Sequence, residues 1–227
     1  MKNATGINIL KRFAIGNCVV KIASVEPLGA PGALDDALCQ LSQYRRDKTL
    51  RYRYDKGKML SAGAGLLLNN MLMERGLHER DMVYVDGEHG KPAFLNYPEI
   101  HFNLSHSDTL VTCALSDTPV GVDVQHLVKL REGLVRYTMS DEEIAVFEAL
   151  DNDDAKQLLF TQLWTLKESY AKATGRGLTH DFPSFEISET GEVTPLTTLI
   201  PCATFKLIRL PNAVSAVAVI NDGPRNS

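Results

Sequence analysis

Two long segments with helical patterning, each accompanied by short β-like runs, limit most strongly how this chain can fold. The first helical segment is Lys56–Met73, and the second is Asp154–Thr174, which ends before Gly175. Two successive blocks that each combine a long helix with antiparallel strands predict an α+β fold. We therefore expect two lobes of similar size, residues 1–118 and 119–227, in the chain of 227 residues.

Shorter elements follow from alternation and from turn residues. A helix is expected over Ala33–Arg46, and a capping box predicts that a short helix begins at Ser140. Ser116–Pro119 indicates a hairpin connection between the strands before and after it. The predicted strands are Val19–Val25, Met82–Val85, Ile100–Leu104, Leu110–Leu115, Val120–Gln125, Phe185–Ser188, Ala203–Arg209 and Ala213–Ile220.

Two glycines lie inside the first long helix. Gly63 and Gly65 each cost about 1 kcal/mol relative to alanine in a helix interior. Their presence predicts close approach of another backbone or of a ligand, with tight core packing as the simpler explanation.

Charge and cysteine usage argue against several classes of protein. The net charge of -4 gives no reason to expect nucleic acid or an anionic membrane as a partner. The four cysteines lack the spacing of a zinc site or a disulfide framework, which favours reduced thiols in the cytoplasm. No apolar run has the length of a signal peptide core or a membrane span. We expect a cytoplasmic protein, monomeric because two complete lobes share one chain.

Basic residues outnumber acidic residues between Arg45 and Lys58. Such a local excess suits a polyanionic ligand, although an ordinary solvated surface produces the same pattern.

An acidic residue on a predicted strand and another on a predicted helix form the strongest candidate site. Period-2 alternation places Asp123 and Gln125 on one face of the strand. In W-T-L-K-E-S-Y-A-K, helical spacing places Trp164, Glu168 and Lys172 on one side of the helix. Two carboxylates suffice for a Mg²⁺ site shared with substrate phosphates. The alternative is an ordinary surface Glu-Lys pair on the helix.

The stretch His101–Ser107 runs from a strand into a turn. The Ser105 hydroxyl, the His106 imidazole and nearby backbone N–H groups suit a phosphate. A Ser-His nucleophilic pair is a poorer interpretation, because adjacent side chains point apart and no G-x-S-x-G surrounds Ser105. Lys91 and Pro92, in the motif G-K-P, add a cation in a stiff turn.

Taken in chain order, the motifs resemble a known family. They are G-K-P (90–92), F-N-L-S-H-S (102–107), G-V-D-V-Q (121–125), W-T-L-K-E-S-Y-A-K (164–172) and G-R-G-L (175–178). The chain resembles the 4′-phosphopantetheinyl transferases of the surfactin-synthetase-activating (Sfp) type. The resemblance implies two related α+β lobes with a pseudo-two-fold relation and coenzyme A in the cleft between them. It also implies transfer of the phosphopantetheine arm to a serine of an acyl- or peptidyl-carrier protein, with release of adenosine 3′,5′-bisphosphate.

The resemblance also assigns roles to individual residues. Asp123 and Glu168, with Gln125, would hold Mg²⁺, and Glu168 and Lys172 would act in catalysis, Glu168 as the base for the serine. Residues expected to contact coenzyme A are Arg45, Lys48, Lys58, Ser61, Lys91, Pro92, Ser105, His106 and Lys172.

One position departs from the family pattern. Many relatives have Glu where this chain has Gln125, which removes a formal charge from the metal site. An amide oxygen still ligates Mg²⁺, so we expect weaker metal binding. Two alternatives stay open: a catalytically weak module that binds coenzyme A or a carrier protein, and a magnesium-dependent phosphohydrolase.

Overall fold

The structure is a computed structural model that describes residues 6–87, 90–175, 177, 182–199 and 202–221. The chain divides into two compact units, Met1–Asp117 and Thr118–Ser227. Each unit combines helices with antiparallel strands, which confirms the predicted α+β class. None of the helices in the described residues is long and apolar enough to span a membrane. The predicted pseudo-two-fold relation and cleft stay predictions.

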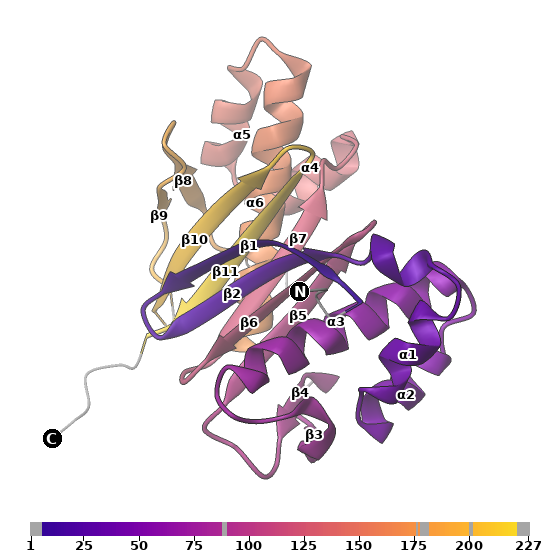
Figure 1. Ribbon diagram of the computed structural model, residues 1–227. Coiled ribbons are helices and arrows are strands. Elements are labelled where there is room, and N and C mark those ends of the chain that lie inside the picture. Colours follow the sequence, from indigo (N-terminus) through magenta and orange to yellow (C-terminus); the bar gives the residue numbers. More distant parts are fainter. Residues whose placement is uncertain (1–5, 88–89, 176, 178–181, 200–201, 222–227) are drawn as a thin grey trace, which may run out of the picture. The chain divides into compact units, whose positions relative to one another are not determined.

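The first unit is built on an antiparallel sheet with the strand order β1-β2-β6-β5 (Figure 1). A small separate sheet pairs β3 with β4. The elements are β1 (Asn8–Ile15), β2 (Cys18–Ser24), the short 3-10 helix η1 (Glu26–Gly29), α1 (Ala33–Cys39), α2 (Gln43–Leu50), α3 (Asp55–Met73), the 3-10 helix η2 (Glu79–Asp81), β3 (Tyr84–Asp86), β4 (Pro92–Phe94), β5 (His101–Ser107) and β6 (Leu110–Ser116).

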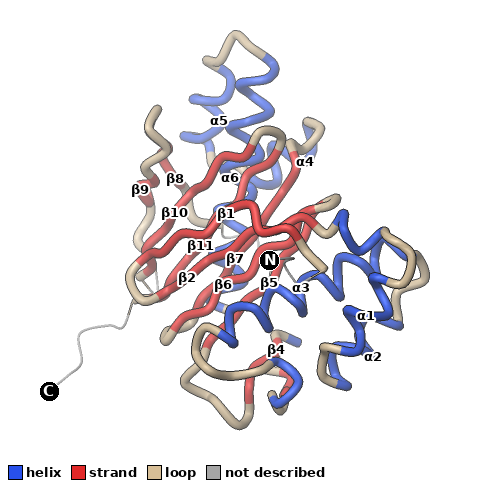
Figure 2. Tube along the Cα trace, viewed as in Figure 1, coloured by secondary structure: helices blue, strands red, loops and turns tan. Residues whose placement is uncertain are grey.

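Helix α3 packs against β6, β5 and β2, and α1 and α2 lie beside it (Figure 2). Its two interior glycines explain how closely the neighbouring segments approach. A Cβ on Gly63 would lie 2.3 Å from Val25 Cγ1, and one on Gly65 would lie 2.9 Å from Leu41 Cδ2. Both neighbours are buried core side chains, so the simpler explanation, tight core packing, is correct at these positions.

One sequence prediction for this unit needs correction, and one long strand was not predicted. The helix expected over Ala33–Arg46 is two helices, because Ser42 caps a new one by accepting a hydrogen bond from Arg45 N. The hydroxyl of Ser42 also donates to the buried carboxylate of Glu79, which fixes the break between the helices. Strand β1 was not predicted, because most of its residues are exposed and its alternation is weak.

The second unit has an antiparallel sheet with the order β10-β11-β7 and a two-stranded sheet of β8 and β9. The long helix α6 packs against β7 and β11, and α4 and α5 lie beside α6 (Figures 1 and 2). The elements are β7 (Val120–His126), α4 (Glu132–Thr138), α5 (Asp141–Glu148), α6 (Asp153–Thr174), β8 (Phe185–Ile187), β9 (Val193–Pro195), β10 (Ala203–Leu210) and β11 (Ala213–Ile220).

The ends of two helices follow the sequence signals. Ser140 and Glu143 form the predicted capping box at the start of α5. Gly175, in the left-handed conformation with φ 70°, ends α6.

The hairpin predicted at Ser116–Pro119 is wrong. Strand β6 already has β2 and β5 as neighbours, and β7 belongs to the sheet of the second unit.

Candidate functional site

The strand-helix pair β7 and α6 carries the first candidate site, which lies entirely within the second unit. Asp123 on β7 is 1% exposed. Its Oδ1 accepts a hydrogen bond from Lys172 Nζ at 2.6 Å, and its Oδ2 accepts one from Gln125 Nε2 at 3.3 Å. Residues from the predicted strand and the predicted helix therefore meet, as their spacing indicates.

Close backbone packing brings these two elements together. A Cβ on Gly121 would lie 2.1 Å from Ser169 O and 2.3 Å from Ala173 N, both on α6. Only glycine allows this approach, because any side chain would meet helix backbone that cannot move aside. Asp123 follows Gly121 by two residues and therefore lies on the same face of β7.

Glu168 shares this environment. Burial raises the pKa of the Glu168 carboxyl, the negative charge of Asp123 raises it further, and the Lys172 ammonium lowers it. Asp123 and Glu168 are thus close enough for their charges to interact. Such a pair of carboxylates binds protons or cations more readily than either group alone.

The oxygen donors of this site fit a magnesium ion that keeps several water ligands. Among the described residues, no group of three His, Cys, Asp or Glu side chains is placed to hold a metal ion. The donors here would be the carboxylates of Asp123 and Glu168 and the amide oxygen of Gln125. Gln125 now directs its amide nitrogen toward Asp123, so its amide would have to turn to offer oxygen.

Other residues of the W-T-L-K-E-S-Y-A-K motif serve the core. Trp164 packs against the apolar core of the second unit and stacks on Phe160, with ring centroids 6.3 Å apart. Lys167 is buried and pairs with Glu143. Arg176 and Leu178, from the last motif, lie outside the described residues.

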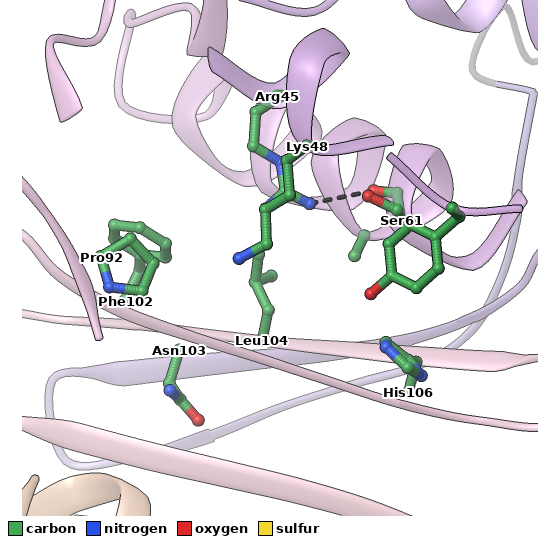
Figure 3. Close-up of a pocket in the computed structure, with 10 residues that line it drawn as sticks. Arg45, Lys48, Ser61, Pro92, Phe102, Asn103, Leu104 and His106 are labelled. Carbon is green, nitrogen blue, oxygen red and sulfur yellow. Dashed lines mark hydrogen bonds between the residues drawn. The ribbon is translucent and has the colours of Figure 1, made fainter. Parts of the chain in front are cut away.

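A cavity of about 160 Å³ in the first unit is the second candidate site (Figure 3). Helices α2 and α3 line one side of it, and strands β4 and β5 supply other lining residues. The lining residues are Arg45, Lys48, Tyr52, Ser61, Ala64, Pro92, Phe102, Asn103, Leu104 and His106.

Positive charge dominates this cavity. Arg45 is 3% exposed, and its guanidinium donates to the carbonyl oxygen of Ser61 at 2.9 Å (Figure 3). Arg45 Nε is buried and makes no hydrogen bond within the part of the chain that the structure describes. Burial lowers the pKa of the Lys48 ammonium, and the nearby charge of Arg45 lowers it further. An anion in the cavity would offset both effects.

The cavity brings together five of the residues predicted to contact coenzyme A: Arg45, Lys48, Ser61, Pro92 and His106. The Ser61 hydroxyl shares a hydrogen bond of 2.8 Å with Thr49 on α2, and the Ser61 carbonyl accepts from Arg45, so both groups tie α3 to α2 beside the cavity. The Lys48 side chain extends into the cavity toward β5 (Figure 3).

The other predicted contacts are not among the lining residues of this cavity, and their roles stay predictions. Lys58 forms an ion pair of 3.0 Å with Asp55. Burial lowers the pKa of Lys91 to about 8. Ser105 precedes the cavity residue His106 on β5 and is buried.

Tyr52 and Asn103 line the cavity but were not predicted. Tyr52 lies within the basic segment that suggested an anionic ligand, so its position in the sequence was an available signal. Asn103 lies inside the F-N-L-S-H-S motif, and an amide between apolar strand residues gives no distinct signal for an anion site.

Comparison with known proteins supports the family resemblance. A family model described as the 4'-phosphopantetheinyl transferase superfamily matches residues 119–218. The 4'-phosphopantetheinyl transferase Sfp of Bacillus subtilis is 28% identical over 148 residues, which cover 65% of this chain and 66% of that protein. The 4'-phosphopantetheinyl transferase HetI of Nostoc sp. is 30% identical over 206 residues, covering 87% of this chain and 86% of that protein. The chain belongs to the 4'-phosphopantetheinyl transferase family.

The match to the Nostoc phosphopantetheinyl transferase spans 87% of this chain, so the aligned region includes both candidate sites. The match to the Bacillus subtilis transferase spans slightly less than two thirds of that relative's length. A solved holo-(acyl-carrier-protein) synthase from Bacillus anthracis in complex with CoA (3',5'-ADP) is 16% identical, with a TM-score of 0.41. The match covers 47% of this chain and 97% of the synthase chain.

Proposed function

We propose that this protein transfers the 4′-phosphopantetheine arm of coenzyme A to a serine of an apo carrier protein. The observation that carries the proposal is the meeting of Asp123, Glu168 and Lys172 across β7 and α6. Two carboxylates and an ammonium in one partly buried cluster suit a diphosphate and its counterion. Family membership supports the same conclusion.

In this reaction the serine oxygen attacks the phosphorus that carries the pantetheine arm. A bond forms from that oxygen to phosphorus, and the bond from phosphorus to the bridging oxygen breaks. Adenosine 3′,5′-bisphosphate leaves with the bridging oxygen. Magnesium, when bound by Asp123, Glu168 and Gln125, would offset negative charge on the diphosphate.

Glu168 is the proposed base for the serine proton. Burial and the charge of Asp123 raise its pKa, which favours proton uptake, whereas Mg²⁺ bound to the same carboxylate would lower it. Lys172 lies on the same helix as Glu168 and donates a hydrogen bond to Asp123. We propose that its ammonium contacts a phosphate oxygen of coenzyme A when the substrate is bound. Arg45 and Lys48 are the proposed contacts for the 3′-phosphate of coenzyme A, because they supply the charge in the cavity of the first unit.

A direct test is to incubate the protein with coenzyme A, Mg²⁺ and an apo carrier protein and then weigh the carrier. A mass gain equal to the phosphopantetheine arm supports the transferase. Free bisphosphate with an unmodified carrier supports the phosphohydrolase. Binding of coenzyme A without either product supports a weak binding module, which only Gln125 favours.

We also propose a monomer in the cytoplasm, and light scattering after size exclusion tests the oligomeric state.

Gln125→Glu is expected to tighten Mg²⁺ binding about tenfold, because a third carboxylate adds charge to the ligand set. The change also removes the hydrogen bond from Gln125 Nε2 to Asp123. Titration calorimetry with MgCl₂ measures the effect. Gln40→Glu adds the same charge at a residue of the first unit that is not among the proposed ligands, and it serves as the control. Unchanged or weaker binding in Gln125→Glu would remove position 125 from the metal site.

Lys48→Gln is expected to raise KM for coenzyme A about tenfold, because a charge-assisted hydrogen bond to phosphate is lost. KM for dephospho-coenzyme A, which lacks the 3′-phosphate, should change little. Lys11→Gln, at an exposed position on β1, is the matched control. Steady-state kinetics with both substrates decide the assignment, and an equal rise in both KM values would place Lys48 elsewhere on the substrate.

A further inference from the structure

A buried ion pair joins three helices of the second unit, apart from the residues assigned so far to substrate or metal. Lys167 Nζ lies 2.5 Å from Glu143 Oε2, and both side chains are 1% exposed. Lys167 also donates to the carbonyl oxygen of Thr138 at 2.6 Å. The ammonium of α6 is therefore bound to α5 and to the last residue of α4.

Glu143 connects further segments through its two oxygens. Oε2 accepts from the backbone N–H of Ser140 at 2.9 Å, which completes the capping box of α5. Oε1 accepts from the backbone N–H of Phe185 at 2.9 Å, at the first residue of β8. One carboxylate thus holds the start of a helix, the start of a strand and the side chain of α6.

Lys167 directly precedes Glu168, and successive residues of a helix point about 100° apart. The Lys167 side chain therefore fixes α6 from a direction different from that of Glu168 and Lys172, which face Asp123. The backbone of α6 is fixed again at Gly121, which permits its contact with β7. Together these contacts set both the rotation of α6 and its position along β7.

Stability alone is a weak reason for such a pair. Removing two charges from water costs about as much as their attraction returns, and apolar replacements of buried pairs are often neutral or stabilising. A pair that holds a helix in one rotation has a different use when that helix carries reactive groups.

We propose that Glu143 and Lys167 are positioning residues that orient α6 so that Glu168 and Lys172 meet Asp123. The proposal rests on the proposed transferase function, because it assigns the pair to the same site. Neither residue touches the substrate in this account; both act through the placement of α6.

The main test is the double variant Lys167→Met/Glu143→Gln, which removes both charges and leaves no unpaired buried ion. We expect kcat to fall about tenfold and the Mg²⁺ dissociation constant to rise about tenfold, as for other residues that orient metal ligands. KM for coenzyme A should change less than kcat, because Arg45 and Lys48 of the cavity in the first unit are unaltered and only the proposed contact from Lys172 on α6 is disturbed.

Folding of the second unit can be measured separately. The only tryptophan of the chain, Trp164, lies on α6, so its fluorescence in urea reports this unit. The control is the same pair of changes in the first unit, Lys21→Met/Glu74→Gln, where Lys21 Nζ lies 2.6 Å from Glu74 Oε1 and Glu74 is 48% exposed. This control should keep wild-type kcat and Mg²⁺ affinity.

If the double variant has a cooperative Trp164 transition but wild-type kcat and Mg²⁺ affinity, the pair is only structural and the proposal is wrong. If the double variant does not fold, Lys167→Arg decides. Its larger head group keeps the charge but displaces α6, so kcat and metal affinity should fall in a folded protein. Wild-type values for both in Lys167→Arg would overturn the proposal. Wild-type protein that leaves the carrier unmodified contradicts the transferase function instead, and calorimetry still tests the placement of the metal ligands.

Discussion

Glu168→Gln is expected to lower kcat about 1000-fold while coenzyme A still binds, because glutamine cannot accept the serine proton. It also removes a carboxylate from the oxygen donors opposite Asp123. Carrier modification measured by mass gives kcat, and calorimetry gives the affinity for coenzyme A. Glu148→Gln, at an exposed position on α5, is the control and should keep full activity. Full turnover in Glu168→Gln would remove this residue from the mechanism.

The same variant has a second expected effect, on stability. The pKa of Glu168 is raised in the folded protein by burial and by Asp123. Between the unfolded and folded pKa values the folded state binds more protons, so stability falls as pH rises through that window. Glutamine cannot ionise, so the variant should unfold at a higher urea concentration than wild type at neutral pH. A variant that is inactive and less stable would point to damaged packing.

Gly121→Ala is expected to destabilise the second unit by about 3 kcal/mol and to abolish transfer. The added Cβ would lie 2.1 Å from Ser169 O, so β7 and α6 would have to separate. Asp123 would then move relative to Glu168. Urea unfolding followed by Trp164 fluorescence measures the loss.

The control for this substitution is Gly133→Ala on α4, where a Cβ meets no atom within 4 Å among the described residues. Alanine is the better helix former, so this variant should be as stable as wild type or more stable by up to about 1 kcal/mol. Equal stability in both variants would show that β7 and α6 tolerate a wider separation than their contact indicates.

The α+β class was predictable because long helical segments and alternating runs are local patterns in the sequence. The approach of Asp123 to α6 was predictable for the same reason, but the ion pair with Lys172 was not, because Lys172 was expected to bind a phosphate. The break at Ser42 was not predictable, because it depends on a hydrogen bond to Glu79, distant in sequence. The hairpin at Ser116–Pro119 failed because the pairing of β6 is decided by strands remote in sequence.

The role of Lys167 illustrates a different limit. Within the W-T-L-K-E-S-Y-A-K motif, three charged residues have the same kind of neighbours in sequence. Glu168 and Lys172 face Asp123, whereas Lys167 is buried against Glu143. Lys167 differs from the other two because α5 packs against its side of α6. The spacing of residues along one helix does not reveal which other helix packs against it.

The hydrogen bonds of Asp123 have a consequence for metal binding. Both of its oxygens are already engaged by the chain, by an ammonium and by an amide. The carboxylate of Asp123 is thus neutralised from within the chain. In the proposed transferase, a divalent ion would have to displace the ammonium and the amide from these oxygens, an exchange favoured when an incoming diphosphate draws Lys172 away.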